Sequence, residues 1–216
     1  MSEAVRKYFN RTVDDFDGIY GGKGVLWHWI NRQFRRDMYE RYRLTFENCG
    51  DVNGRTVLDI GCGGGRYSIE FAKRGATQVV GIDFAVNMVK LAQEQALVQN
   101  VKDRCQFMVG DFMQMEFHRS FDICLAIGVF DYIAQPQPFL EKMRSTSNHW
   151  LILSFPSTSM VRTPLRKIRY WFKKCPVYFY DQVKIERLVS GLGPYRLIKI
   201  PGQGMDYFVA IQVRGG

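Results

Sequence analysis

The stretch Val57-Leu-Asp-Ile-Gly-Cys-Gly-Gly-Gly-Arg66 decides the fold. Residues Val57 to Ile60 have the apolar pattern of a buried strand, and a run of glycines from Gly61 to Gly65 follows at once. Residues without a Cβ let the chain turn sharply and let the backbone approach a ligand closely. A strand that passes through such a turn into a helix is typical of open α/β sheets that bind nucleotides. The stretch therefore predicts the first strand and first turn of a sheet of that kind.

Outward from this stretch, strand and helix patterns alternate along the chain. Alternation of this kind predicts an α/β fold with a mostly parallel sheet and helices on both faces. The last two strands are close enough in sequence to form a hairpin, which predicts one antiparallel strand. Ligands bind beyond the carboxyl ends of such strands, so the loops after Ile60, Ile82, Val109 and Ile127 are expected to share one crevice. The expected strands are 56–60, 78–83, 105–109, 121–127, 149–155, 195–200 and 206–213. The expected helices are 67–73, 86–99, one that follows Pro136 and Pro138 and ends at about 146, and 181–190.

The domain organisation follows from composition and charge. Residues 1–50 are aromatic-rich with helical spacing, which predicts an N-terminal helical segment before a core at 51–216. The net charge is +9, and residues 142–180 hold eight Lys and Arg and no acidic residue. A basic block on a nearly neutral body indicates a local surface for something anionic. We therefore expect a basic insertion in the core at about 156–180.

Several classes of protein are excluded by what the sequence lacks. No apolar stretch is long enough to span a bilayer, and the N-terminus has no apolar signal region. The five cysteines are scattered without a CxxC pair, which favours a reducing cytoplasm over a disulfide framework or a zinc site, and no metal site is predicted. Arg66 stands where a nicotinamide fingerprint needs a small residue, and no Walker lysine follows the glycines.

Three acidic residues come at the ends of the predicted strands. Asp59 lies inside the end of the first strand, Asp83 ends the second, and Asp111 follows the third. A carboxylate at Asp83 can accept hydrogen bonds from both hydroxyls of a ribose and would repel a 2′-phosphate. Asp111 is placed for an exocyclic amine, with the ring of Phe112 for the face of an adenine.

Together the segments VLDIGCGGG, VVGIDF, VGDF and FDICLAIGVFDYI resemble the class I S-adenosylmethionine-dependent methyltransferases of the small-molecule type. The resemblance implies S-adenosyl-L-methionine as cofactor and a Rossmann-like, seven-stranded sheet in the order 3-2-1-4-5-7-6 with strand 7 antiparallel. It also implies roles for individual residues in holding the cofactor. It implies Asp59, Gly61, Gly63 and Gly65 for the methionine part, Asp83 for the ribose, Asp111 and Phe112 for the adenine, and the backbone of Ile127, Gly128 and Val129 for the amino-acid end. Cys62, Phe84 and Met88 are further candidate cofactor-binding residues.

The N-terminal segments Val5–Asn10 and Phe16–Tyr20 resemble the leading helices of magnesium-protoporphyrin methyltransferases. In such enzymes these helices cover the cofactor, so the resemblance implies that residues 1–50 form an N-terminal helical cap or lid. The resemblance makes Tyr20 a candidate substrate-binding residue.

Methyl transfer by displacement needs the acceptor atom held in line with the methyl group, and a base only where the acceptor must lose a proton. The loop after the fourth strand supplies Asp131 and Tyr132, which we expect to orient or deprotonate the acceptor. A carboxylate in this place suits a hydroxyl acceptor. The sequence therefore predicts methylation at an oxygen atom of a small-molecule or lipid-linked acceptor.

The basic stretch 163–174 has the pattern of an amphipathic helix that begins at Thr163 and Pro164. Arg166 and Arg169 are candidate substrate-binding residues for an anionic acceptor, and the same helix would suit the surface of an anionic membrane. Signatures for methylation of nucleic-acid bases are missing, so nucleic acid is not the expected partner. Two alternatives stay open: an RNA methyltransferase that uses 162–174 on phosphates, and a non-catalytic protein that binds S-adenosylmethionine.

Overall fold

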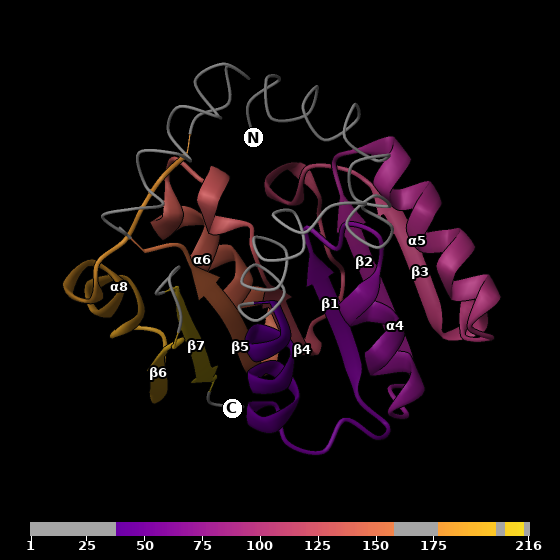
Figure 1. Ribbon diagram of the computed structural model, residues 1–216, viewed down its shortest axis with the longest axis horizontal. Helices are drawn as coiled ribbons and strands as arrows, with labels where there is room; N and C mark the ends of the chain where they lie inside the picture. Colours follow the sequence, from indigo (N-terminus) through magenta and orange to yellow (C-terminus); the bar gives the residue numbers. More distant parts are fainter. Residues whose placement is uncertain (1–37, 158–176, 202–205, 214–216) are drawn as a thin grey trace, which may run out of the picture.

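The computed structural model describes residues 38–157, 177–201 and 206–213. They form one seven-stranded sheet in the order β3-β2-β1-β4-β5-β7-β6 (Figure 1). Strand β7 runs antiparallel to both of its neighbours, β5 and β6, while the other pairs are parallel. The predicted fold class, strand order and antiparallel strand are thus confirmed.

The elements follow the expected boundaries within two residues, except that the helix expected after Pro138 begins at Pro136. The strands are β1 (Thr56–Ile60), β2 (Gln78–Asp83), β3 (Cys105–Val109), β4 (Phe121–Ala126), β5 (Ser147–Phe155), β6 (Tyr195–Lys199) and β7 (Tyr207–Gln212). The α-helices are α4 (Arg66–Lys73), α5 (Val86–Val98), α6 (Pro136–Thr146) and α8 (Gln182–Val189). Three short 3-10 helices lie at Lys102–Arg104, Phe112–Gln114 and Phe130–Tyr132.

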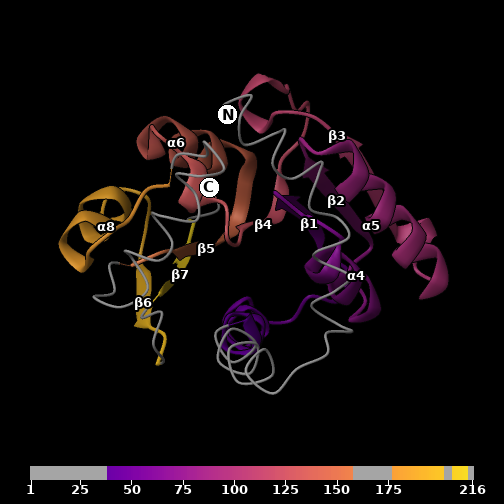
Figure 2. The ribbon, with the colours of Figure 1, turned by 45° about the horizontal axis from the view of Figure 1, so that its top comes forward.

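The sheet lies between two layers of helices, and an apolar core fills the space between the sheet and the helices on each face. Helices α4 and α5 pack on one face, and their buried side chains join one core with Val57 and Val79. Helices α6 and α8 pack on the other face, where Leu58 and Val80 point. Alternate residues of β1 and β2 therefore face opposite cores, as the two-residue period of a strand requires. Figure 2 shows α6 and α8 away from α4 and α5.

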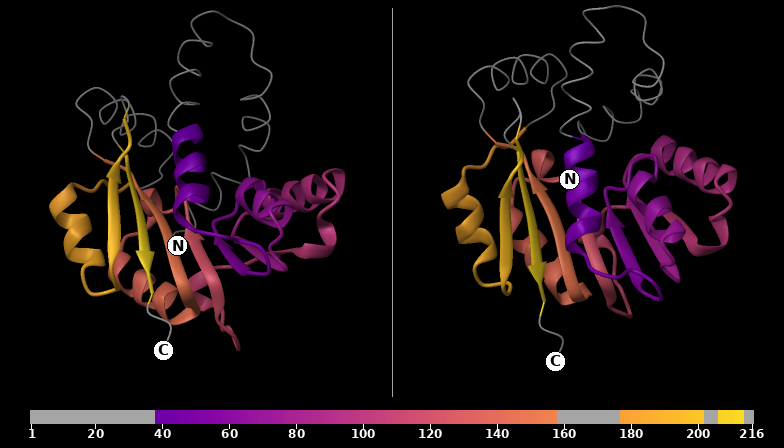
Figure 3. Two further views of the ribbon diagram at one scale, coloured as in Figure 1. Left: turned by 90° about the horizontal axis from the view of Figure 1, so that it is seen from below. Right: turned by 60° about the horizontal axis from the view of Figure 1, so that its bottom comes forward.

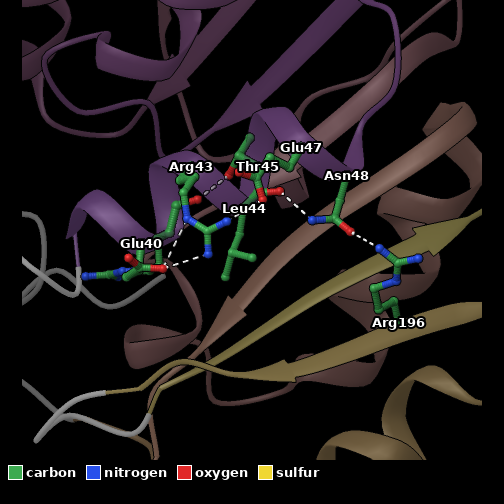
Figure 4. Close-up of polar contacts among 8 residues, drawn as sticks. Glu40, Arg43, Leu44, Thr45, Glu47, Asn48 and Arg196 are labelled. Atoms are coloured by element: carbon green, nitrogen blue, oxygen red, sulfur yellow. Dashed lines mark hydrogen bonds and ion pairs between the residues drawn. The ribbon is translucent and has the colours of Figure 1, made fainter.

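Residues 38–48 are helical and lie on the same face as α4. Leu44 is buried there, and the ring of Phe46 lies 4.7 Å from that of Phe71 in α4. Figure 3 shows this helix in violet against the strands. At its end, the Asn48 amide oxygen accepts a 2.9 Å hydrogen bond from Arg196 of β6 (Figure 4). The helix, called the covering helix below, is thus attached to both α4 and the edge of the sheet.

Three parts of the prediction lie outside the described residues. They are residues 1–37 of the predicted cap, residues 158–176 of the basic insertion predicted at about 156–180, and the candidate substrate residues Tyr20, Arg166 and Arg169. Within the part of the chain that the structure describes, no helix combines the length and apolar character needed to cross a membrane.

Candidate functional site

A cavity of about 780 Å³ opens at the carboxyl ends of β1, β2 and β4. Its volume falls within the ~300–1,000 Å³ range of small-molecule sites. Three of the four predicted loops meet in it, together with the covering helix. Of the residues predicted from the sequence, the cavity is lined by Gly61, Cys62, Gly63, Asp83, Phe84, Met88, Ile127, Gly128, Asp131 and Tyr132.

The glycine loop passes under the turn that follows β4. Gly61 has a φ of +73°, and a Cβ there would lie 2.5 Å from a methyl carbon of Val129. Any other residue would therefore push the two loops apart. The loop is also tied to β2, because the N–H groups of Gly61 and Cys62 donate to the carbonyl oxygen of Ile82 at 2.7 and 3.1 Å. The close approach of the glycine loop to the turn after β4 thus explains why position 61 is a glycine. Both loops line the cavity.

Asp83 stands at the end of β2 and is 7% exposed. One carboxylate oxygen accepts the N–H of Gly63 and the other accepts the N–H of Ala85, both at 2.9 Å. Burial raises the pKa of Asp83, and the backbone hydrogen bonds oppose that rise. Each carboxylate oxygen accepts more than one hydrogen bond, so the group can hold the loop and still face hydroxyls in the cavity.

Asp59 lies in β1 beneath the glycine loop and is 2% exposed. The Ser68 hydroxyl of α4 donates to it at 2.6 Å. Burial raises the pKa of Asp59 to about 7, and the negative charge of Asp83 contributes to the rise. Asp59 does not line the cavity surface, and neither does Gly65, which begins α4 as its N-cap with a φ of +81°.

The turn after β4 presents an acidic and a phenolic side chain to the same space. Asp131 is 6% exposed and lines the cavity together with Tyr132. The backbone of the turn is held from outside, because Tyr178 N–H donates to the Asp131 carbonyl oxygen at 2.9 Å. At the start of the turn, Gly128 N–H donates to the Ser154 hydroxyl at 2.8 Å. The two candidate catalytic residues therefore sit on a fixed support beside the glycine loop.

The covering helix adds residues that the sequence analysis missed. Met38, Arg41 and Tyr42 line the cavity from this helix, and Arg66 does so from the start of α4. A terminal nitrogen of Arg41 lies 3.7 Å from the position of a Cβ on Gly128. The spacing of three and four between these residues was a usable signal, since it places them on one helical face. Only docking of the helix shows that this face meets the cavity.

The loop after β3 differs from the prediction. Asp111 caps the short helix Phe112–Gln114 by accepting the N–H of Met113 at 3.0 Å. Phe112 is 3% exposed, with its ring 5.1 Å from that of Phe139 in α6. Neither residue lines the cavity. The Phe112 ring offers no free face to an adenine because it is packed into the core under α6.

Among the described residues, no cluster of three or more His, Cys, Asp and Glu side chains is arranged to hold a metal ion.

Comparison with known proteins gives one family and several individual relatives. A family model described as "Methyltransferase domain" matches residues 51–186. The chain belongs to this methyltransferase family. It is a class I enzyme that depends on S-adenosylmethionine, as the sequence predicted.

Two of the relatives of this methyltransferase are named for small-molecule substrates or pathways. The magnesium-protoporphyrin O-methyltransferase of Synechocystis sp. is 28% identical over 202 residues, which cover 88% of this chain and 85% of that protein. A crystal structure of magnesium protoporphyrin IX methyltransferase from Synechocystis, with bound S-adenosylhomocysteine, has a TM-score of 0.73 at 25% identity and covers 97% of this chain and 98% of that one. The ubiquinone biosynthesis O-methyltransferase of Neisseria meningitidis is 37% identical over 89 residues, 40% of this chain and 37% of that protein's length.

The cavity of the methyltransferase fits its cofactor chemically. Nothing lies within 4 Å of a Cβ position on Gly63, so the loop faces open space where a ligand can approach the backbone. Asp83 supplies an acceptor for ribose hydroxyls, and Phe84 and Met88 supply apolar surface next to it. These residues would hold S-adenosylmethionine along the glycine loop.

Proposed function

We propose that this methyltransferase transfers the methyl group of S-adenosylmethionine to an oxygen atom of a small-molecule or lipid-linked acceptor that carries a negative charge. The observation that carries the proposal is the nearly buried Asp131 carboxylate in the cavity wall, next to the glycine loop. A carboxylate that is withdrawn from water in a cavity is suited to accept a proton from a hydroxyl group.

The chemistry divides simply between cofactor and chain. S-adenosylmethionine supplies a methyl group on a positively charged sulfur, which leaves with the electron pair of its bond to carbon. Asp131 would take the proton of an acceptor hydroxyl as the new oxygen–carbon bond forms, and Tyr132 would orient that hydroxyl. Most of the rate enhancement would come from holding the acceptor oxygen at about 3–3.5 Å and in line with the methyl group.

Positively charged side chains in and near the cavity support the proposal that the acceptor is an anion. Arg41 reaches the β4 turn on which Asp131 lies, and a guanidinium can bind a carboxylate or phosphate through two hydrogen bonds. Residues 158–176 carry six Lys and Arg and no acidic residue. The described ends of this segment are near the same turn, since Tyr178 is bonded to Asp131 and Tyr180 N–H donates to the Pro156 carbonyl oxygen at 2.9 Å. Arg166 and Arg169 stay candidates for contact with the acceptor.

The names of two relatives support methylation at oxygen, although other matched proteins are named for methylation at nitrogen. The matched proteins from Synechocystis and Neisseria are both named O-methyltransferases. Their names suggest two candidate acceptors for this protein, a metal-bound protoporphyrin and a precursor of ubiquinone.

The test is transfer of labelled methyl groups to a defined panel of acceptors. The purified protein is incubated with S-adenosylmethionine labelled in the methyl group and one of three acceptors: magnesium protoporphyrin IX, a polyprenylated catechol that carries a carboxylate, or a catechol without a charged group. We expect a product whose label is attached to oxygen, as an ester released by mild base or as an aryl ether recognised by mass spectrometry. The Asp131→Asn variant should form less of an ether product. Label on nitrogen or carbon, or preference for the neutral catechol, would contradict the proposal.

A further inference from the structure

Arg66 is a charged residue at the junction of the glycine loop and the covering helix. It is the first residue of α4 and follows Gly65 directly. Its guanidinium carbon lies 4.7 Å from the ring centre of Tyr42 and 5.5 Å from that of Tyr39. Both rings belong to the covering helix and are three residues apart. One cation thus joins the loop that faces the cofactor to the helix that lies over it.

Tyr42 has a second bond to α4. Its hydroxyl is hydrogen-bonded to Glu70, and burial together with Glu70 raises the pKa of Tyr42 to about 12. The Tyr42 hydroxyl is protonated at neutral pH and can donate its hydrogen bond to Glu70. The aromatic ring that stacks on Arg66 is in this way held at a fixed place over α4.

The covering helix touches α4 at its other end through a similar contact. The Arg74 guanidinium carbon lies 4.1 Å from the ring centre of Phe46, and the Phe46 ring packs on Phe71. Arg74 does not line the cavity, whereas Arg66 does. The two arginines therefore make the same type of contact with one helix, but only the Arg66 contact is at the cavity.

We infer that Arg66 is a positioning residue that holds the covering helix over the cofactor and slows release of the bound nucleotide. While Arg66 stacks on Tyr39 and Tyr42, the helix keeps Met38 and Arg41 in the cavity wall. Loss of the stack loosens that wall without removing a hydrogen-bond partner from Asp83 or the glycine loop. The inference concerns the cofactor side of the cavity and is independent of the acceptor.

The first test compares Arg66→Ala with Arg74→Ala. Dissociation of S-adenosylhomocysteine is followed by stopped-flow displacement, and hydrogen exchange is measured for amides of residues 38–48 at saturating nucleotide. Cation–π contacts of this kind predict that Arg66→Ala releases nucleotide about 3- to 30-fold faster and exchanges the helix amides faster. Arg66→Lys should recover part of the slow release, since it keeps a cation. Arg74→Ala removes the distant contact with Phe46 and the 2.7 Å ion pair with Glu70, so it should speed release less than Arg66→Ala does. Release from Arg66→Ala that is no faster than from the unchanged protein, or no faster than from Arg74→Ala, would overturn the inference.

The second test separates positioning from direct contact with the nucleotide. Tyr39 is 60% exposed and does not line the cavity, so Tyr39→Ala removes part of the stack without touching the ligand. If Arg66 acts through the helix, Tyr39→Ala speeds release, and Arg66→Ala adds less than its full effect in that background. If Arg66 binds the nucleotide itself, Tyr39→Ala has no effect, the two changes are additive, and the inference fails. Because these readouts use product binding, they are independent of whether the enzyme methylates oxygen.

Discussion

The Asp83 carboxylate accepts the N–H of Gly63 at 2.9 Å and so ties the end of β2 to the loop that leaves β1. Its other oxygen accepts the N–H of Ala85 at the start of α5. One side chain therefore shapes the glycine loop and faces the cavity at the same time.

Replacement of Asp83 by Asn should weaken cofactor binding. The amide keeps one acceptor oxygen, so either Gly63 or Ala85 loses its partner and the negative charge is lost. Hydrogen bonds to a charged group are worth about 1.5–3 kcal/mol, which predicts a roughly 10- to 100-fold weaker affinity for S-adenosylhomocysteine by calorimetry. Asp122→Asn, a similar change at the opposite end of the sheet, is the control. Unchanged affinity in Asp83→Asn would remove Asp83 from the cofactor site.

Asp59 should make stability depend on pH. Its folded pKa of about 7 is above the value of about 3.9 for an unfolded chain, so the folded state holds the proton more tightly. Stability is therefore lost as pH rises from about 4 to about 7, where the unfolded state binds fewer protons. We expect Asp59→Asn to lack this part of the slope in urea unfolding measured across that range. Parallel slopes for the two proteins would show that Asp59 titrates normally.

Asp131 and Tyr132 should affect turnover rather than cofactor affinity. General acid–base groups contribute about 10²–10⁴-fold to rates, so Asp131→Asn should lower kcat with a hydroxyl acceptor by that order. Tyr132→Phe should lower it less, since it loses an orienting hydroxyl only. The affinity for S-adenosylhomocysteine is measured in parallel and should stay within about threefold of the original. A variant with normal kcat would indicate that these residues only shape the turn.

Arg41 should govern the acceptor. Arg41→Ala is expected to raise KM for an anionic acceptor about tenfold, because a charged hydrogen-bonded contact is lost. Arg41→Lys should recover part of the affinity but not the paired geometry of a guanidinium. Steady-state kinetics and nucleotide calorimetry on the same variants check this. Weaker nucleotide binding with an unchanged acceptor KM would assign Arg41 to the cofactor instead.

Asp122 should matter for stability alone. One of its oxygens accepts both the N–H and the hydroxyl of Thr56, at 2.8 and 2.9 Å, and so joins the starts of β1 and β4. Asp122→Ala leaves these partly buried donors unpaired, which predicts a loss of about 1–3 kcal/mol in urea unfolding. Nucleotide affinity should not change, because this cluster is at the amino end of the sheet. A large loss of affinity would show that the two ends are coupled.

Much of the fold was predictable because its signals are local. The strand before Gly61 and the helix α5 show their periods within a few residues, and strands joined by helices allow few arrangements of a sheet. The strand order itself came from resemblance to a family, and the paired strands confirm it. Asp83 was predicted as a ribose-binding residue because it ends the second predicted strand, 18 residues after Gly65.

Other parts of the site depended on contacts that no local pattern contains. Phe112 follows an acidic residue at a strand end, as an adenine contact would, but it packs against Phe139, which is 27 positions further along the chain. Arg41 had no role in the sequence analysis, and docking of the covering helix on α4 brings it to the cavity.

The strands, the glycine turn and the carboxylates at the strand ends could be predicted from the amino-acid sequence. Their signals, which are hydrophobic periodicity and the residues that favour turns, lie within a few neighbouring positions. Only the tertiary structure decided which side chains reach the cavity and which are buried. That choice depends on how helices dock on the sheet, and docking is set by side-chain packing between segments far apart in the chain.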